Sequence, residues 1–477
     1  MGNLNRVTTP ALEEDVRPSP GGSNTDGLRT PASTRPSDPA PATQDRTPPV
    51  GTLVLDPPPR AARPTSDGQP APDASASPAN GAPPADSPAP TLGKSRRRYH
   101  EVDLLRFLAA VAVVLYHYLF RASVEDPVFA NTGFTDSLGI FRYGNLGVNL
   151  FFVISGFVIL NSAWKKRPSA FVASRVGRLY PAFWVACTVT AIVILLDPGG
   201  RFGVTPEKYL YNLTMAPGLF DVSLIDGAYW TLLVELKFYL LVLVLCLVGM
   251  TLNRVFGFAA GWLAVSVWDV VVEPLPPFLS GLLIPEWAPY FVAGIIFALV
   301  AREGWSKRYA AVLVVASGWA TYLAVDLAAK QSDSYGAALS PWVVGGIVIG
   351  IFVLFALIAS HKLQARWMAR VAFLGGLTYP LYLLHQYIGF ILFDLGHGRM
   401  SRWLVLAGVL TIVVGMAWLL HVVVEERCAA PLARWVREKW EPVRTFALST
   451  HPIEPAHTRQ WSASNTSAPG SSFARMY

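Results

Sequence analysis

One apolar stretch carries ionisable side chains at a spacing that could serve chemistry. Residues 103–120 read DLLRFLAAVAVVLYHYLF and include Asp103, Arg106 and His117. At roughly 100° per residue, the eleven steps from Arg106 to His117 leave both side chains within about 20° of each other on a helix. A rise of ~1.5 Å per residue separates them by roughly 16 Å along the axis. Ionisable groups in a membrane cost ~2.5–3.5 kcal/mol each, so this stripe predicts a functional site.

The residue types on this stripe indicate acid–base chemistry. Histidine is the side chain best suited to proton transfer near neutral pH, so His117 could take a proton from an alcohol. Arg106 could hold a carboxylate, a phosphate or a carbonyl oxygen through two hydrogen bonds. The structural alternatives are a clamp between Arg106 and Asp103, and a satisfied helix–helix contact for His117. The stripe alone leaves both alternatives open.

Two further stretches place charges at or beside apolar runs. Residues 229–239 put Glu235 near the start of a predicted span, where an intramembrane carboxylate needs a partner. The predicted loop 171–181 carries Arg175 and Arg178 at i,i+3, where they could clamp the phosphates of a cytoplasmic cofactor. The alternative for the two arginines is the ordinary basic character of cytoplasmic loops.

A late apolar stretch, residues 377–385, also has a polar face. Tyr379, Tyr382 and His385 follow one another at steps of three, which places them on one side of a helix. They could line a site, or they could serve packing and anchoring at the membrane interface.

Composition bounds the class of protein. The chain has 477 residues, of which 52% are hydrophobic and only 15% charged. A soluble domain carries about a quarter charged residues, so the composition predicts a polytopic membrane protein. The net charge of +7 comes with basic residues in short loops between apolar runs, which favours membrane topology over a nucleic-acid partner. Three cysteines without CxxC spacing indicate neither a disulfide framework nor a metal site.

We predict an all-α integral membrane protein with a bundle of about ten transmembrane helices and disordered N- and C-terminal tails. Residues 1–98 form a Pro/Ala/Ser-rich disordered tail, 99–440 the transmembrane domain, and 441–477 a short polar tail. The alternation of basic and less basic loops places both termini in the cytoplasm of a multi-pass inner (plasma) membrane protein. The predicted spans are 103–121, 146–163, 180–196, 229–249, 255–272, 287–301, 309–327, 341–360, 371–393 and 402–424.

Five motifs together resemble the acyltransferase-3 family of polytopic membrane O-acyltransferases. They are DLLR at 103–106 followed by His117, GVNLFFVISGF at 147–157, FVASRVGRLYP at 171–181, WTLLVELKFY at 230–239 and GLTYPLYLLH at 376–385. The resemblance covers about residues 100–440 and leaves both tails unexplained. One departure lies at the end of the last span, where HVVVEERCAAP replaces the family's Glu followed closely by Pro and leaves the role of Glu425 or Glu426 open.

The resemblance implies acyl transfer, usually of acetyl from acetyl-CoA, to a hydroxyl of a carbohydrate or lipid-linked glycan such as lipopolysaccharide. His117 and Arg106 would be the essential pair, with Glu235 in the same cavity, and Arg175 and Arg178 would lie near the CoA entrance. The residues expected to bind substrate or support the site are Asp103, Trp230, Tyr379, Tyr382 and His385.

No permanently bound cofactor is expected, because acetyl-CoA or another acyl-CoA serves as co-substrate. The expected partners are the acyl donor, a carbohydrate or glycolipid acceptor, and membrane lipids. Some members of the family carry an extra extracytoplasmic hydrolase-like domain. We expect no such domain in this chain. It would then either finish the reaction itself or use a separate extracytoplasmic transferase.

Two other classes of function remain open on the residues alone. A transporter or exporter of a sugar or lipid precursor could use the same Asp, Arg, His and Glu side chains as a relay. It would be expected to show the interrupted half-helices and repeats typical of transporters, and we find no internal repeat. A membrane-anchored scaffold would leave the buried ionisable stripe without purpose.

Overall fold

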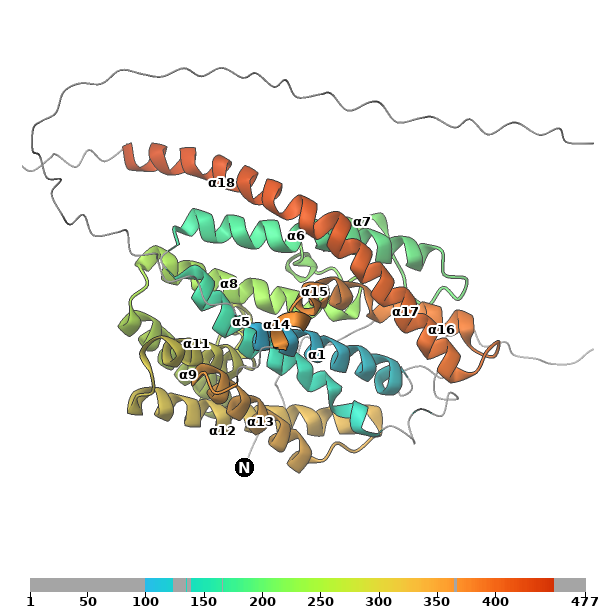
Figure 1. Cartoon of the computed structure of the whole chain (residues 1–477), viewed down its shortest axis with the longest axis horizontal. Coiled ribbons are helices and arrows are strands. Elements are labelled where there is room, and N and C mark those ends of the chain that lie inside the picture. Colours follow the sequence, from blue (N-terminus) through green and yellow to red (C-terminus); the bar gives the residue numbers. More distant parts are fainter. Residues whose placement is uncertain (1–98, 123–133, 135–138, 165, 364–366, 450–477) are drawn as a thin grey trace, which may run out of the picture. The chain divides into compact units, whose positions relative to one another are not determined.

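The structure is a computed structural model that describes residues 99–122, 134, 139–164, 166–363 and 367–449. The predicted tail over residues 1–98 and the end of the chain from residue 450 lie outside the described residues. Within the described ranges, all regular structure is helical (Figure 1). The predicted all-α class is thus confirmed.

Long helices make up most of the described chain. They are α1 (His100–Tyr116), continued by the π-helical turn η1 (His117–Arg121), α5 (Gly147–Ala163), α6 (Pro168–Leu195), α8 (Trp230–Val248), α9 (Leu252–Val271), α11 (Ala288–Glu303), α12 (Lys307–Tyr335), α13 (Pro341–Ala359), α17 (Arg402–Leu420) and α18 (Glu426–Ser449). The shorter elements are η2 (Gly139–Leu146), α7 (Pro206–Asn212), η3 (Pro217–Phe220), η4 (Gly227–Tyr229), α10 (Pro277–Leu283), α14 (Met368–Val371), α15 (Leu374–Leu384), α16 (Gln386–Gly396) and the π-turn η5 (His421–Glu425).

Nine helical stretches of the described residues are long and apolar enough to cross a membrane. Each of them matches one of the ten predicted spans. The remaining predicted span, 371–393, is not one helix. It is divided at His385 into the short helices α15 and α16.

Local sequence signals set the helix ends. The hydroxyls of Thr251 and Ser306 accept hydrogen bonds from backbone N–H groups in the first turns of α9 and α12. Gly249 and Gly304 end α8 and α11 with φ values of 93° and 85°, which a residue without Cβ adopts at little cost. These signals lie between the apolar runs, so the spans could be located from the sequence.

One predicted loop is wrong, and one predicted boundary falls within a helix. The segment 171–181 is helical rather than a loop, because α6 already begins at Pro168, and proline is favoured in the first helical turn. The C-terminal boundary at residue 440 falls inside α18, which continues to Ser449 and packs beside α6 (Figure 1).

Helices α5 and α11 approach each other through glycine. A Cβ atom at Gly156 would overlap the Phe291 carbonyl oxygen, and one at Gly294 would overlap the Val153 carbonyl oxygen. Small residues allow such close backbone contact, which is a main source of helix association in membranes. The contact fixes α5, which carries side chains of both pockets described below.

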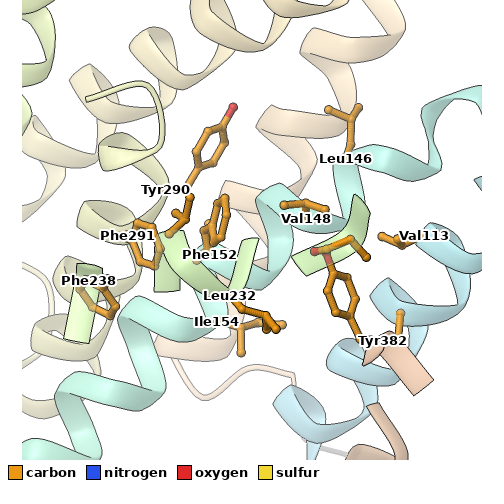
Figure 2. Packing of buried hydrophobic residues seen from close by; sticks show 14 of the residues in the cluster. Val113, Leu146, Val148, Phe152, Ile154, Leu232, Phe238, Tyr290, Phe291 and Tyr382 are labelled. Carbon is orange, nitrogen blue, oxygen red and sulfur yellow. The ribbon is translucent and has the colours of Figure 1, made fainter. Parts of the chain in front are cut away.

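Aromatic rings fill the space between α5, α8 and α11 (Figure 2). The ring of Phe291 lies 4.3 Å from that of Phe238 and 4.8 Å from that of Phe152, measured between centroids. Figure 2 also shows Tyr382, from α15, among the side chains of α1, α5 and α8. Phe152 belongs both to this packed region and to the lining of one of the pockets described below.

Candidate active site

Two pockets lie within the helix bundle, each with a volume of about 100 Å³. We call the first the basic pocket, and its polar lining comprises Arg106, Ser155, Arg175, Arg178, Glu235, Tyr239, Thr378 and Tyr379. We call the second the histidine pocket, and its polar and aromatic lining includes His117, Asn145, Asn149, Trp230, Trp287, Gln331 and Gln386. Two residues, Val148 and Tyr382, line both.

The basic pocket suits an anion. Three arginines and one glutamate among its lining residues leave two formal positive charges in excess. Arg106 comes from α1, while Arg175 and Arg178 come from successive turns of α6. Guanidinium groups that converge from two helices can hold phosphate oxygens through charge-assisted hydrogen bonds.

Glu235 is held in place within this pocket. Its Oε1 accepts hydrogen bonds from the Ser155 hydroxyl at 2.8 Å and from the Tyr239 hydroxyl at 2.5 Å. The guanidinium carbon of Arg175 lies 5.9 Å from the centre of the Tyr239 ring, within the range of a cation–π contact. The carboxylate therefore has the partners that an intramembrane carboxylate requires, and it is surrounded by positive charge.

The histidine pocket has a different chemistry. Its amide side chains can donate to and accept from hydroxyl groups. Nδ2 of Asn145 already donates to the side-chain oxygen Oε1 of Gln331 at 3.0 Å. The indole rings of Trp230 and Trp287 lie 5.1 Å apart. Arg121 is the one side chain with a permanent formal charge among the described residues that line it. Such a lining suits an uncharged, hydroxyl-rich ligand.

His117 opens the π-helical turn at the end of α1 and lines the histidine pocket. Its side chain is 8% exposed, and its buried Nδ1 has no hydrogen-bond partner among the described residues. Irregular turns of this type recur at functional sites, because they turn a side chain away from the regular helical path. Nδ1 is the buried ring nitrogen, so Nε2 is the nitrogen that can face a ligand.

Tyr382 forms part of the wall between the pockets. Its hydroxyl donates to the Ala228 carbonyl oxygen at 3.0 Å and accepts from the Thr231 hydroxyl at 2.7 Å. Both bonds tie α15 to the start of α8, and they fix the ring in the position that Figure 2 shows. Any group that passes from one pocket to the other by the shortest route would pass this ring.

The break between α15 and α16 occurs at His385, whose ring lies next to that of His117. The His385 carbonyl oxygen accepts from the Tyr118 hydroxyl at 2.6 Å, and the Leu383 carbonyl oxygen accepts from the Tyr229 hydroxyl at 3.1 Å. The Tyr387 N–H donates to Asp226 Oδ2 at 3.0 Å. A helix broken inside a membrane is tolerated only when the freed backbone groups find such partners.

Sequence reasoning missed these supporting side chains. Tyr118 directly follows His117, and Asp226 lies in the loop before α8, where it also accepts from the Ala228 N–H at 2.9 Å. Asp226 is fully buried. The available signal was a carboxylate followed by glycine directly before an apolar span, which is also an ordinary helix start.

His385 itself lines neither pocket but faces His117. The two ring centroids are 5.0 Å apart, with 63° between the ring planes. His385 Nδ1 lies 2.8 Å from the Tyr382 carbonyl oxygen, while its buried Nε2 has no partner among the described residues. The tyrosine–histidine face predicted on residues 377–385 therefore lines both pockets through its tyrosines and contacts the ring of His117 through His385.

The structure brings together most of the predicted site residues, but not in one cavity. Arg106, Arg175, Arg178, Glu235 and Tyr379 line the basic pocket. His117 and Trp230 line the histidine pocket, so the expectation that His117 shares a cavity with Arg106 and Glu235 is not met. The cause is length, since eleven residues of helix span roughly 16 Å even when both side chains point the same way.

Besides His385, one predicted supporting residue, Asp103, lies outside the pockets, and so do the two glutamates whose role the sequence left open. Asp103 packs against α15, where a Cβ atom at Gly375 would lie 2.9 Å from the Asp103 Cβ. Glu425 is buried in the second π-turn, with its Oε2 2.7 Å from His421 Nδ1, whereas Glu426 is exposed. Of the two glutamates whose role the sequence left open, Glu425 is thus the buried one and lies closer to His421, since Glu426 Oε1 is 3.6 Å from His421 Nε2.

Comparison with known proteins agrees with the motifs. The sequence profile described as an acyltransferase domain matches residues 99–422. The chain therefore belongs to this family, the acyltransferase-3 membrane acyltransferases. No solved structure matches the chain.

Several named relatives share most or part of the domain. Nodulation protein 10 of Rhizobium leguminosarum bv. viciae is 27% identical over 335 residues, which are 64% of this chain and 86% of that protein. The putative membrane-bound transacylase BcsY of Komagataeibacter xylinus is 25% identical over 70% of this chain and 83% of its own length. The peptidoglycan O-acetyltransferase OatA of Listeria monocytogenes is 34% identical over 105 residues, which are 20% of this chain and 14% of that protein.

Proposed function

We propose that this protein transfers an acetyl group from acetyl-CoA to a hydroxyl of a carbohydrate or lipid-linked glycan. The observation that carries the proposal is a buried histidine in a pocket of amides and indole rings, next to a separate pocket with three arginines. The family supports acyl transfer, and one relative is named for O-acetylation of a cell-envelope glycan. The rival function, a transporter, does not require a base beside an uncharged pocket.

The basic pocket is the proposed donor site. Arg175 and Arg178 attract the phosphates of CoA, while Arg106 lies across the same pocket on α1. The thioester end of the donor points past Tyr382 toward the histidine pocket. No cofactor needs to remain bound, because acetyl-CoA is consumed as a co-substrate.

The histidine pocket is the proposed acceptor site. An acceptor hydroxyl gives its proton to Nε2 of His117, and its oxygen attacks the carbonyl carbon of the thioester. The C–O bond forms, the C–S bond breaks, and CoA leaves as a thiolate that is protonated by water. The products are the acetyl ester and free CoA, and the proton on His117 returns to solvent.

We further propose that the two pockets open toward opposite faces of the inner membrane. Basic residues gather in the connections at the Arg106 end of α1, which the positive-inside rule places in the cytoplasm together with both termini. His117 then lies toward the opposite face, where an envelope glycan or a separate extracytoplasmic transferase would receive the acetyl group.

The test is acetyl transfer by the purified full-length protein in lipid nanodiscs. The wild type should release free CoA from acetyl-CoA only when a glycan acceptor is present, with one acetyl ester formed per CoA. His117→Gln should lower kcat by ~10²–10⁴-fold, the usual contribution of a general base. The control is His397→Gln, an exposed histidine outside both pockets. Full activity of His117→Gln would overturn its role, and glycan movement without CoA release would favour the transporter.

A further inference from the structure

The geometry behind His117 points to a second histidine with a defined task. We propose that His385 is a positioning residue that selects the tautomer of His117, so that Nε2 of His117 presents its lone pair to the acceptor hydroxyl. This inference rests on the proposed function, in which His117 is the base.

Both histidines have a buried ring nitrogen that finds no partner within the described part of the chain. These atoms are Nδ1 of His117 and Nε2 of His385, and the two rings lie 5.0 Å apart at an angle of 63°. His385 is fully buried, and the rings of Tyr116 and Phe390 lie 5.1 and 6.1 Å from the ring of His117. An unpaired buried polar atom is destabilising, so two of them on facing rings require an explanation.

The tautomer of His385 follows from the backbone carbonyl oxygen that its Nδ1 contacts. Its Nδ1 lies 2.8 Å from the Tyr382 carbonyl oxygen, which can only accept, so Nδ1 carries the proton. In the neutral ring, Nε2 of His385 then holds a lone pair. The only complementary arrangement for His117 has its proton on Nδ1, directed at that lone pair, and this leaves Nε2 of His117 unprotonated.

Proton uptake strengthens the same contact. When Nε2 of His117 takes the hydroxyl proton, the ring becomes a cation whose Nδ1–H still faces the lone pair of His385. A neutral acceptor there stabilises the charge that develops in the transition state. Hydrogen bonds of this kind are often long in a free enzyme and shorten when the substrate is bound.

Hydrogen bonds at the helix break fix the rings of His117 and His385 relative to each other. The Tyr118 hydroxyl, one residue after His117, donates to the His385 carbonyl oxygen at 2.6 Å. Gly389 makes room for this bond, since a Cβ atom there would overlap the same hydroxyl. Asp226 accepts from the Tyr387 N–H at 3.0 Å, and so keeps α16 separate from α15. His385 is the residue at the break, and its ring lies 5.0 Å from that of His117 at the end of α1.

Two substitutions separate tautomer selection from a merely structural role. In His385→Gln, the amide reaches the place of Nε2 and can accept from His117, but it loses the donor at Nδ1. In His385→Asn, the amide keeps the donor to Tyr382 but leaves His117 without an acceptor. We expect His385→Asn to lower kcat by ~10–100-fold with the KM for acetyl-CoA unchanged, as for other partners that orient a functional histidine. His385→Gln should stay within a few-fold of wild type. A structural role predicts the reverse order.

The direct measurement is the ¹⁵N NMR spectrum of histidine-labelled protein in nanodiscs, with the His117 signals assigned through His117→Gln. In the wild type, Nδ1 of His117 should carry the proton, and in His385→Asn the proton should move to Nε2. An Nε2–H tautomer in the wild type, or activity lost in His385→Gln and kept in His385→Asn, would overturn the proposal. If the wild type transfers no acetyl group at all, the proposed function fails, whereas the NMR result still decides the tautomer.

Discussion

The basic pocket and the histidine pocket have the same volume and share Tyr382 and Val148, yet their linings differ in charge. One has three arginines and a carboxylate, and the other has a single arginine among amides and indoles. The size of a cavity therefore says little about what each would bind, whereas the charge of its lining separates an anionic ligand from an uncharged one. One short helix, α15, carries residues of both.

The pockets differ also in how their polar groups are satisfied. In the basic pocket, the Glu235 carboxylate is bonded to Ser155 and Tyr239 before any ligand arrives. In the histidine pocket, the nitrogen Nδ1 of His117 has no partner among the described residues. The Thr378 hydroxyl in the basic pocket also has no partner among the described residues, so the contrast concerns the ionisable groups: a carboxylate held by two hydroxyls in one pocket, and an imidazole with an unpaired nitrogen in the other.

The largest effect should come from removing the wall between the pockets. Tyr382→Ala would leave the acetyl group without a fixed path, and misplacement of reacting groups by about 1 Å can cost ~10²-fold in rate. We expect acetyl transfer to fall by that factor while hydrolysis of acetyl-CoA by water rises, both measured as CoA release with and without acceptor. Tyr382→Phe is the matched control, because it keeps the ring and loses only the bonds to Ala228 and Thr231. Coupled transfer at the wild-type rate in Tyr382→Ala would show that the pockets do not communicate there.

The next largest effect should be confined to the basic pocket. Each hydrogen bond to a charged group contributes about 1.5–3 kcal/mol, so Arg178→Ala should raise the KM for acetyl-CoA by about 10–100-fold. Arg175→Ala should act in the same direction. The control is Arg370→Ala, an exposed arginine outside both pockets. The KM for the acceptor should not change, and a change in acceptor KM alone would assign the basic pocket to the acceptor instead.

The sequence predicted which residues line the pockets better than it predicted which of them share a pocket. Nine spans follow from apolar runs bounded by caps and glycines, and Arg106, Glu235 and His117 stand out because charge is costly in a membrane. The split between the pockets depends on tertiary contacts of Tyr382, which helical periodicity cannot show. The break at His385 was missed because the run 371–393 is mostly apolar and long enough for one span. The groups that stabilise the break come from Tyr118, Tyr229 and Asp226, far away in the chain.

A moderate effect should reach both pockets at once. Gly294→Ala would push α5 away from α11, and overpacking of this kind costs about 1–3 kcal/mol. Since α5 carries Val148 and Ser155, we expect a lower melting temperature in detergent together with raised KM values for both substrates. Gly346→Ala on α13 is the matched control, because a Cβ atom there meets nothing within 4 Å. Unchanged stability of Gly294→Ala would show that the close approach of the two helices is not required.

The smallest effect should come from the second bond to Glu235. Both Ser155 and Tyr239 donate to Oε1, so Ser155→Ala leaves the carboxylate with one donor and with its Oε2 still available to a guanidinium or a ligand. A bond to a charged group contributes about 1.5–3 kcal/mol, and because the Tyr239 hydroxyl still donates to the same oxygen we expect no more than the lower end of this range, a rise of up to roughly ten-fold in the KM for acetyl-CoA. The control is Ser162→Ala on the same helix, which lines neither pocket and whose hydroxyl donates to the Ile159 carbonyl oxygen at 3.0 Å. Because Ser155 lies in the basic pocket, the acceptor KM should stay constant. A change in the acceptor KM alone would mean that Glu235 acts on the histidine pocket across the Tyr382 ring. The two pockets would then not be independent binding sites.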